Sequence, residues 1–478
     1  MKLINYKTNI WFSIWGCGYL ETTATIRGEI VRYLQNHRMT INQFARISGI
    51  NSGTLSNILN GNRPMSMHQL DRITEGMGLE EGHFYNLYIT ESIFHTTPDW
   101  RRLRPFLKRC AELDKLDCLH RTARMTLENI NYVPMLFEMA EELFIEEKHK
   151  AAALLYECVA ECEKLQYSER LALCQYRLFL IRLGENQEEN LQAAVYFEPY
   201  IDRLDEMYQL DAYVKLINLN ISLQRMDKIE ALAKRMEHHA RIHYQQNRSW
   251  FEGSGNPRKP LIFYILYSYL IQAYLYQERG DYDNAFYYVS LYEKPDWITN
   301  ASNEESLIMN QFKEWAEANR YMFSLMSGQP GALHQYVDYV ESRENEIFLA
   351  LCNIMVAANR YQLHVDPILD RFKEHLHYRS QQNELGKISD QVTINRYTRL
   401  LAELGIYYLN AKQYDHGLSY ILDSLEYSIR IKSDNGMLRC MGIFEQFRHA
   451  ATEDILNRYN ELIRDVQKLS VYAWSPVV

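Results

Sequence analysis

A chain of 478 residues is too long for one compact core, so it predicts two or more domains or a solenoid. With 47% hydrophobic and 24% charged residues, its composition excludes a mainly disordered protein. The formal net charge of −9 excludes a protein that coats nucleic acid nonspecifically, so any DNA affinity must reside on a local face.

The first segment, residues 1–23, imitates a signal peptide, because Lys2 and Lys7 precede an apolar run. The run is short and contains glycines, and it has the bulky Trp15 where an export signal needs small residues. We interpret residues 1–23 as an N-terminal appendage or an overlong gene start, with an export signal as the alternative. No stretch has the length and hydropathy of a membrane span. The eight cysteines, without a CxxC pair, are typical of reduced thiols in a cytoplasmic protein.

Two short helices joined by a tight turn are predicted within residues 40–64. Thr40 and Asn51 can cap their N-termini, and Gly49 permits the turn between them. Apolar residues at helical spacing predict the buried faces, which are Phe44, Ala45 and Ile47 on the first helix and Leu55, Ile58 and Leu59 on the second.

The opposite face of the second helix is small, polar and uncharged. Its residues are Ser52, Gly53, Thr54, Ser56 and Asn57. Side chains this short let a helix enter the major groove deeply, where hydroxyl and amide groups can exchange hydrogen bonds with base edges. The sequence therefore predicts a DNA-reading helix.

This pair of helices resembles the helix-turn-helix of the Cro and phage-repressor type, also called XRE-type. The matching residues are Thr40, Phe44, Ala45, Gly49, Ile50, Ser56, Ile58, Gly61 and Pro64. The flanks agree with it, since an amphipathic helix is predicted over residues 24–38, with Ile26, Ile30, Val31 and Leu34 on one face, and Ser66 with Gln69 forms a capping box.

The resemblance implies a DNA-binding domain of about five helices over residues 24–94. It also implies that the polar face from Ser52 to Asn57 reads bases, while Thr40 and Asn60 approach backbone phosphates. One position departs from the family, because Ile41 stands where these domains usually have a phosphate-binding Gln.

Residues 95–125 are predicted to form a linker helix region that contains the basic segment 100–109. Two interpretations of this segment remain open. Its arginines can lie over DNA phosphates, or they can lie along the surface of an ordinary linker helix.

Helical patterns then recur in pairs over residues 126–440, which predicts an all-α protein with a TPR-like, right-handed superhelix behind the helix-turn-helix domain. Three hairpins carry small residues twelve positions apart, namely Ala140 with Ala152, Ala273 with Ala285, and Gly405 with Gly417. This spacing predicts close antiparallel contact between the two helices of each hairpin. Residues 441–478 are predicted to be C-terminal capping helices.

The first helix of each pair lines the concave wall of such a superhelix. By repeat register, the candidate peptide-binding residues on this wall are Tyr213, Asn220, Tyr267, Tyr274, Gln277, Arg399 and Asn410. Amides can bind an extended backbone, and arginine can hold a carboxylate. The alternative is that these side chains only solvate the wall or pack inside it.

No motif for catalysis is present. The chain lacks a GxSxG elbow, an HExxH pair, and a glycine-rich loop with the strand and helix that phosphate binding requires. We therefore expect no enzymatic activity, no metal and no cofactor.

Together, the two halves resemble the RRNPP family of bacterial peptide-pheromone receptors. This resemblance implies a cytoplasmic, homodimeric transcription regulator that acts in quorum sensing, binds operator DNA through its helix-turn-helix, and binds a short signalling peptide in the groove of the repeats. Two alternatives stay open: a phosphatase-like or antiactivator-like interaction protein acting on a response regulator, and a repressor without a peptide ligand.

Overall fold

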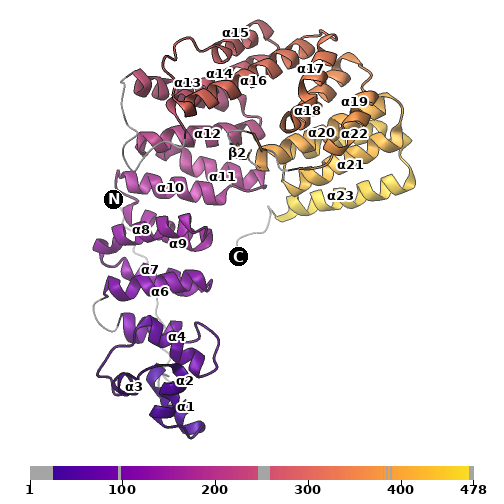
Figure 1. The fold of residues 1–478 in the computed structure, drawn as a ribbon. Helices are drawn as coiled ribbons and strands as arrows, with labels where there is room; N and C mark the ends of the chain where they lie inside the picture. Colours follow the sequence, from indigo (N-terminus) through magenta and orange to yellow (C-terminus); the bar gives the residue numbers. More distant parts are fainter. Residues whose placement is uncertain are drawn as a thin grey trace, which may run out of the picture. The chain divides into compact units, whose positions relative to one another are not determined.

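The computed structural model describes residues 25–94, 98–245, 259–379, 382–383, 386–387 and 390–472. The predicted appendage, residues 1–23, lies outside them. Almost every described element is a helix, so the predicted all-α class is confirmed (Figure 1). The chain divides into two compact units, one ending at Cys162 and the other beginning at Glu163, a boundary inside the predicted repeat domain.

The first unit is built from short helices. They are α1 Ile26–Asn36, α2 Ile41–Ser48, α3 Ser52–Leu59, α4 Met67–Gly76, α5 Tyr85–Tyr88, the π-helix η1 Ile89–Ile93, α6 Trp100–Glu112, α7 Leu116–Thr126, the 3-10 helix η2 Ile130–Tyr132, α8 Val133–Ile145 and α9 His149–Glu163, whose last residue belongs to the second unit.

The second unit contains longer helices in consecutive pairs. They are α10 Glu169–Arg182, α11 Gln187–Phe197, η3 Glu198–Arg203, α12 Glu206–Ser222, α13 Met226–Gln245, α14 Leu261–Glu278, α15 Tyr282–Glu293, α16 Asn303–Met326, α17 Ala332–Glu341, α18 Glu344–Tyr361, α19 Asp366–Arg371, η5 Lys373–His375, α20 Asp390–Asn410, α21 Tyr414–Arg430, α22 Asp434–Phe447, η6 Arg448–Ala450 and α23 Glu453–Tyr472. Two short antiparallel strands, β1 Gln382–Asn383 and β2 Gly386–Lys387, precede α20.

Predicted caps fix the helices of residues 25–94, which we call the head. At α2, the Gln43 amide donates to Thr40 Oγ1 over 3.3 Å, and the Thr40 amide donates to Gln43 Oε1 over 2.8 Å. Ser66 and Gln69 form the same reciprocal box at α4. Each box satisfies two backbone donors that a helix start leaves unpaired, so both predicted helix starts are confirmed.

Two apolar residues of the head lie outward, against the prediction. Val31 is 41% exposed and Ile47 is 54% exposed. On α2 the inward position belongs to Ser48, whose hydroxyl donates to the Phe44 carbonyl over 2.9 Å. That hydrogen bond satisfies the buried polar group, so a serine can occupy a core position that hydropathy alone gives to isoleucine.

The head is joined to the helix that follows it by charge and by aromatic packing. Arg109 of α6 forms ion pairs with Asp71 at 3.2 Å and with Glu81 at 3.0 Å. The Tyr85 and Phe106 rings lie 5.2 Å apart, centroid to centroid. The basic segment 100–109 thus binds within the chain, as the linker-helix interpretation predicted.

Helices of the second unit pack as antiparallel hairpins, and the predicted small residues lie at the contacts. A Cβ atom on Gly405 would lie 3.0 Å from the Gly417 carbonyl oxygen, and one on Gly417 would lie 2.9 Å from the Leu409 amide nitrogen. The predicted close approach of α20 and α21 is confirmed. Ala273 and Ala285 are both fully buried where α14 packs against α15.

The second unit also closes on itself, which a stack with neighbour contacts alone would not do. The backbone amide of Gln187, at the start of α11, donates to the Ile431 carbonyl at the end of α21 over 2.9 Å. Helix ends leave such groups without partners inside their own helices, and here two distant ends satisfy each other. Glu185 and Arg430, 245 residues apart, add a bidentate pair at 2.8 and 2.9 Å.

Candidate nucleic-acid interface

The predicted reading helix, α3, is an exposed helix with a fixed first turn. Asn51 Oδ1 accepts hydrogen bonds from the amides of Gly53 at 2.9 Å and Thr54 at 3.3 Å. Leu55 and Ile58 are fully buried and anchor the opposite face. Helix α3 is therefore fixed by its buried face and by its capped N-terminus, and its polar face can contact a partner.

The seven predicted DNA-binding residues all retain some exposed surface. Gly53, Asn57, Thr40 and Asn60 are exposed, and Ser52, Thr54 and Ser56 are half-buried. The side chains of three of them, Thr40, Ser56 and Asn60, make hydrogen bonds within the head. The Thr40 hydroxyl belongs to the α2 capping box, and Asn60 Nδ2 donates to Ser56 Oγ over 3.4 Å.

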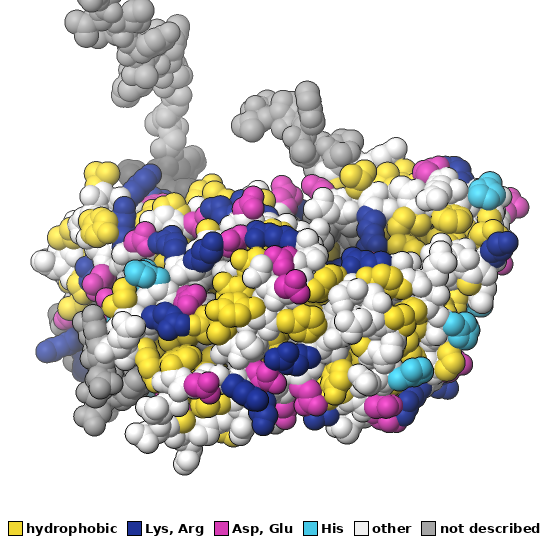
Figure 2. Space-filling view, turned by 90° about the horizontal axis from the view of Figure 1, so that it is seen from above, with side chains coloured by type: hydrophobic (Ala, Val, Ile, Leu, Met, Phe, Trp, Pro, Cys, Tyr) yellow, Lys and Arg dark blue, Asp and Glu magenta, His cyan; other side chains and the backbone are white. Residues whose placement is uncertain are grey.

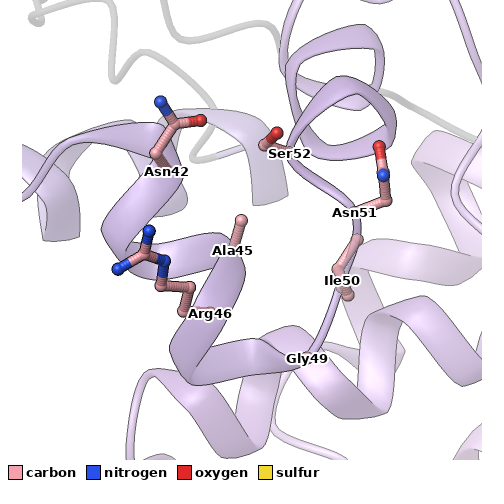
Figure 3. Close-up of a pocket in the computed structure, with 7 residues that line it drawn as sticks. All are labelled: Asn42, Ala45, Arg46, Gly49, Ile50, Asn51 and Ser52. Atoms are coloured by element: carbon pink, nitrogen blue, oxygen red, sulfur yellow. The ribbon is translucent and has the colours of Figure 1, made fainter.

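A hollow of about 450 Å³ opens between α2 and the start of α3. Its lining consists of Asn42, Ala45, Arg46, Gly49, Ile50, Asn51 and Ser52. Asn42 and Ser52 lie on its two sides, with the Ala45 methyl group between them (Figure 3). Of these residues, only Ser52 was a predicted contact. Asn42 and Arg46 were not predicted. Both are exposed and lie four residues apart on α2, which places them on one face of that helix, and this spacing could have indicated them.

Five of the head's six arginines form no ion pair with any residue that the structure describes. They are Arg27, Arg38, Arg46, Arg63 and Arg72, and all five are exposed. The sixth, Arg32, pairs with Glu29 at 2.8 Å. Meanwhile Arg109 and Lys115, outside the head, neutralise its Asp71, Glu80 and Glu81. A segment with balanced formal charge thus presents unpaired cations.

Two of these arginines lie at the turns that bracket α3. A Cβ atom on Gly49 would lie 3.0 Å from Arg72 Nη1, and one on Gly61 would lie 3.0 Å from Arg27 Nη1. Both glycines have positive φ, 64° and 82°. The turns therefore favour glycine for their backbone conformation, and the close approach shows that a guanidinium group lies beside each turn. Guanidinium groups at both ends of a reading helix suit two backbone phosphates.

Comparison with known families agrees with this geometry. Residues 29–81 match the family model of the Cro/C1-type HTH DNA-binding domain. The match contains α2, α3 and the hollow between them, so the chain carries a helix-turn-helix DNA-binding domain of this type. The comparison with curated proteins found no match.

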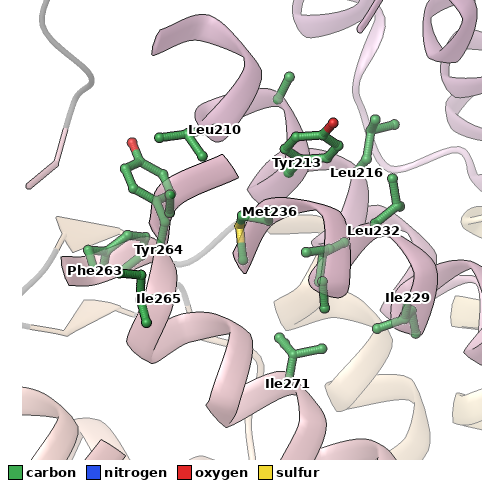
Figure 4. Close-up of a cluster of buried hydrophobic side chains, with 14 of the residues drawn as sticks. Leu210, Tyr213, Leu216, Ile229, Leu232, Met236, Phe263, Tyr264, Ile265 and Ile271 are labelled. Carbon is green, nitrogen blue, oxygen red and sulfur yellow. The ribbon is translucent and has the colours of Figure 1, made fainter. Parts of the chain in front are cut away.

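The predicted peptide-binding residues do not form one accessible group. Tyr213 is fully buried and lies among Leu210, Leu216 and Met236 in the core (Figure 4). Asn220 is also fully buried, and its Nδ2 donates to the Leu216 carbonyl over 2.7 Å. The prediction that both present polar atoms on the wall is corrected, because both side chains are fully buried.

The remaining candidates lie on two helices. On α14, Gln277 is only 8% exposed, whereas Tyr267 and Tyr274 are half-buried. On α20, Arg399 and Asn410 are exposed, but about three turns separate them. Burial and the nearby Glu278 raise the Tyr274 pKa to about 12, and the positive charge of Arg399 acts in the opposite direction.

The surface of the protein carries both signs of charge. On the face in Figure 2, basic and acidic side chains alternate among apolar ones. Within the described ranges, no helix is long and apolar enough to cross a bilayer. The same residues contain no group of three or more His, Cys, Asp or Glu side chains placed to hold a metal.

Proposed function

We propose that this protein is a peptide-responsive transcription regulator without enzymatic activity, which binds operator DNA as a homodimer and a short signalling peptide in its repeat unit. The observation that carries the DNA-binding part is the exposed polar face of α3, with arginines at both of its ends, inside a matched Cro/C1-type domain. The chain has a net negative charge, so one head makes only a few favourable phosphate contacts. Two heads of a dimer on one DNA would double their number.

The peptide-binding part is supported by the second unit. Its hairpins follow the small-residue spacing of TPR-like repeats, and the layout resembles the RRNPP receptors. Closure joins distant helices by the packing of α12 against α20 and by polar contacts of Glu185, Gln187 and Arg430, and a ligand can strengthen or weaken the exposed polar contacts at small energetic cost. We propose that the peptide prefers one curvature of the repeats, because a ligand with equal affinity for both would shift neither population.

The DNA-binding part is tested with a Thr54→Ala, Asn57→Ala double variant in footprinting and gel shifts on DNA upstream of the gene. We expect specific affinity to fall at least about tenfold, since a good base contact contributes about 1–3 kcal/mol of discrimination. Thr90→Ala is the matched control, because this exposed threonine lies in η1, outside the matched domain. Unchanged footprints from the double variant, with helical content intact, would remove α3 from the interface.

The peptide-binding part is tested with synthetic peptides of roughly five to ten residues encoded by small reading frames near the gene. A ligand of the folded unit raises the melting temperature, and at a concentration of 100 times Kd it contributes about 2.7 kcal/mol. If no such peptide shifts the transition while specific DNA binding is intact, the regulator acts without a peptide and this part of the proposal fails.

A further inference from the structure

Helices from different hairpins converge on the N-terminal half of α20. Helix α20 packs against α12 and α18 within the second unit, and the Cys352 thiol of α18 donates to the Arg396 carbonyl in this half over 3.7 Å. Gln187 Nε2 donates to Asn395 Oδ1 over 2.7 Å, which ties the same half to the start of α11. Helix α14 is tied to α12 in turn, because the Tyr267 hydroxyl donates to Asn218 Oδ1 over 2.7 Å.

Two arginines of this half of α20 have no charge partner. Arg396 is half-buried and Arg399 is exposed, and neither guanidinium group forms an ion pair or hydrogen bond with any residue that the structure describes. They are three residues apart, so they lie on the same side of the helix. Two other half-buried arginines of the unit do have charge partners, since Arg320 pairs with Glu293 at 2.6 Å and Arg458 with Asp423 at 2.7 Å.

The nearby acids do not neutralise this pair. Glu403 lies one turn after Arg399, but its carboxylate already accepts from Arg439 and from Asn359 Nδ2. Glu346 of α18 feels the charge of Arg396 without forming an ion pair with it, and burial raises the pKa of this carboxyl group. The arginines therefore keep an unused positive charge at a place where helices converge.

Two tyrosines of α14 lie close enough to this charge to respond to it, and Glu278 of the same helix acts on Tyr274 with the opposite sign. Arg396 acts electrostatically on both Tyr267 and Tyr274, and Arg399 acts on Tyr274. The Tyr267 hydroxyl is engaged with Asn218, whereas the Tyr274 hydroxyl has no hydrogen-bond partner among the described residues. Burial keeps the Tyr274 phenol protonated at neutral pH, so it can donate a hydrogen bond.

We propose that Arg396 and Arg399 form a binding site for a carboxylate of the short peptide, with Tyr274 as a further hydrogen-bond donor. This inference rests on the proposed peptide-binding function. A guanidinium group presents two parallel N–H donors that match the two oxygens of a carboxylate, and two such groups favour an anion over a neutral ligand. The carboxylate is either the free C-terminus of the peptide or an acidic side chain, and both have the same chemistry.

The test uses the full chain, immobilised and exposed to three pools of random heptapeptides. One pool has free C-termini, the second has the same sequences with amidated C-termini, and the third has free C-termini but no Asp or Glu. Retained peptides are identified by mass spectrometry, and the best one is measured by calorimetry. Loss of retention with the second pool identifies the C-terminus as the bound group, and loss with the third identifies an acidic side chain.

The decisive comparison is with an Arg396→Gln, Arg399→Gln variant. We expect its affinity for the best peptide to fall roughly 10- to 100-fold, as for lost hydrogen bonds to a charged group. Arg448→Gln is the matched control, because this arginine pairs on the surface with Glu445 three residues away and should leave affinity unchanged. Equal affinity in the double variant would overturn the site but leave peptide binding standing. Retention of no peptide by the unaltered chain would overturn peptide binding itself, and the site with it.

A second readout separates binding from a structural role. Because Arg396 has no partner to lose, Arg396→Met should leave the melting temperature of the peptide-free chain unchanged or raise it. A fall of several degrees would show that the guanidinium group stabilises the fold, and it would overturn the proposal.

Discussion

Asn51 holds the first turn of α3 by accepting hydrogen bonds from two backbone amides that the helix itself leaves unpaired. The N-cap residue and the base-reading residues of α3 are thus close in sequence but differ in function. Asn51 orders the backbone, and Thr54 and Asn57 meet the partner. A substitution at the first should act through helix order, and substitutions at the others should act through contact with DNA.

The first prediction concerns this cap. Asn51→Ala should destabilise the start of α3 by about 1 kcal/mol, since that is the usual cost of replacing an N-cap residue by alanine. Amide exchange at Gly53 and Thr54 should become faster, and operator affinity should fall. Asn51→Ser keeps a capping oxygen and should behave like the unaltered chain. Equal exchange rates in the Ala and Ser variants would contradict the assigned role.

The second prediction concerns the two arginines beside the glycine turns. Arg27→Gln and Arg72→Gln should each reduce the slope of log K against log salt concentration by about 0.9, the value for one lost phosphate contact. Sequence preference should stay the same, because phosphates carry no base identity. Arg32→Gln is the control, since Glu29 already neutralises that side chain. An unchanged slope in both variants would exclude these arginines from the backbone contact.

Sequence alone could not have found Arg27 and Arg72. They lie on α1 and α4, far in sequence from the turns at Gly61 and Gly49, and only folding places each guanidinium group there. The polar face of α3 was predictable, because helical periodicity determines it locally. The peptide-binding candidates were predicted from repeat register alone, and register does not say which first-helix positions become buried in the core, as Tyr213 and Asn220 do.

At the scale of helices, small residues decide how closely a hairpin packs. Gly405 and Gly417 bring α20 and α21 together so tightly that a methyl group on either would lie 3.0 Å or less from a backbone atom, which is closer than ordinary van der Waals contact. Their spacing in sequence was sufficient to predict the contact, because an antiparallel pair joined by a short turn has only one way to align two residues twelve positions apart. The N-caps of α2 and α4 were also predictable from sequence, because a capping box depends only on two residues three positions apart.

The third prediction tests this packing. Gly417→Ala should destabilise the second unit by about 1–3 kcal/mol, because the new Cβ would lie 2.6 Å from Leu409 Cγ and 2.9 Å from the Leu409 amide nitrogen. Gly442→Ala is the matched control on α22, where a Cβ would meet no atom within 4 Å. The control should stabilise by roughly 0.5–1 kcal/mol through helix propensity. Thermal unfolding in which both variants shift the same way would contradict the close-contact explanation.

At the scale of the whole second unit, closure is the feature that the sequence did not predict. A repeat pattern describes contacts between neighbours, and nothing in it pairs Gln187 with Ile431 or with Asn395, 208 residues away. Hydrogen bonds between polar surface groups carry almost no sequence signature, since any exposed glutamate and arginine could form such a pair. The closing contacts follow only from the accumulated rotation of successive hairpins.

The last prediction concerns this closure. Glu185→Arg should place a like charge beside Arg430 and open the contact. The backbone amide of Gln187 reports this opening directly, because it donates to the Ile431 carbonyl in the closed form. We expect its hydrogen exchange to become about two- to fivefold faster, the range for an exposed ion pair worth up to about 1 kcal/mol. Adding Arg430→Glu should restore protection, since it recreates the pair with its charges exchanged. Restoration identifies the charge interaction as the cause, whereas unchanged exchange in the single variant would show that closure does not depend on it.

The same variant links closure to peptide binding. If the closed form is the one that binds the peptide, Glu185→Arg should lower the apparent affinity for the peptide by the same factor as it lowers the population of the closed form, because apparent affinity falls with the population of the competent state.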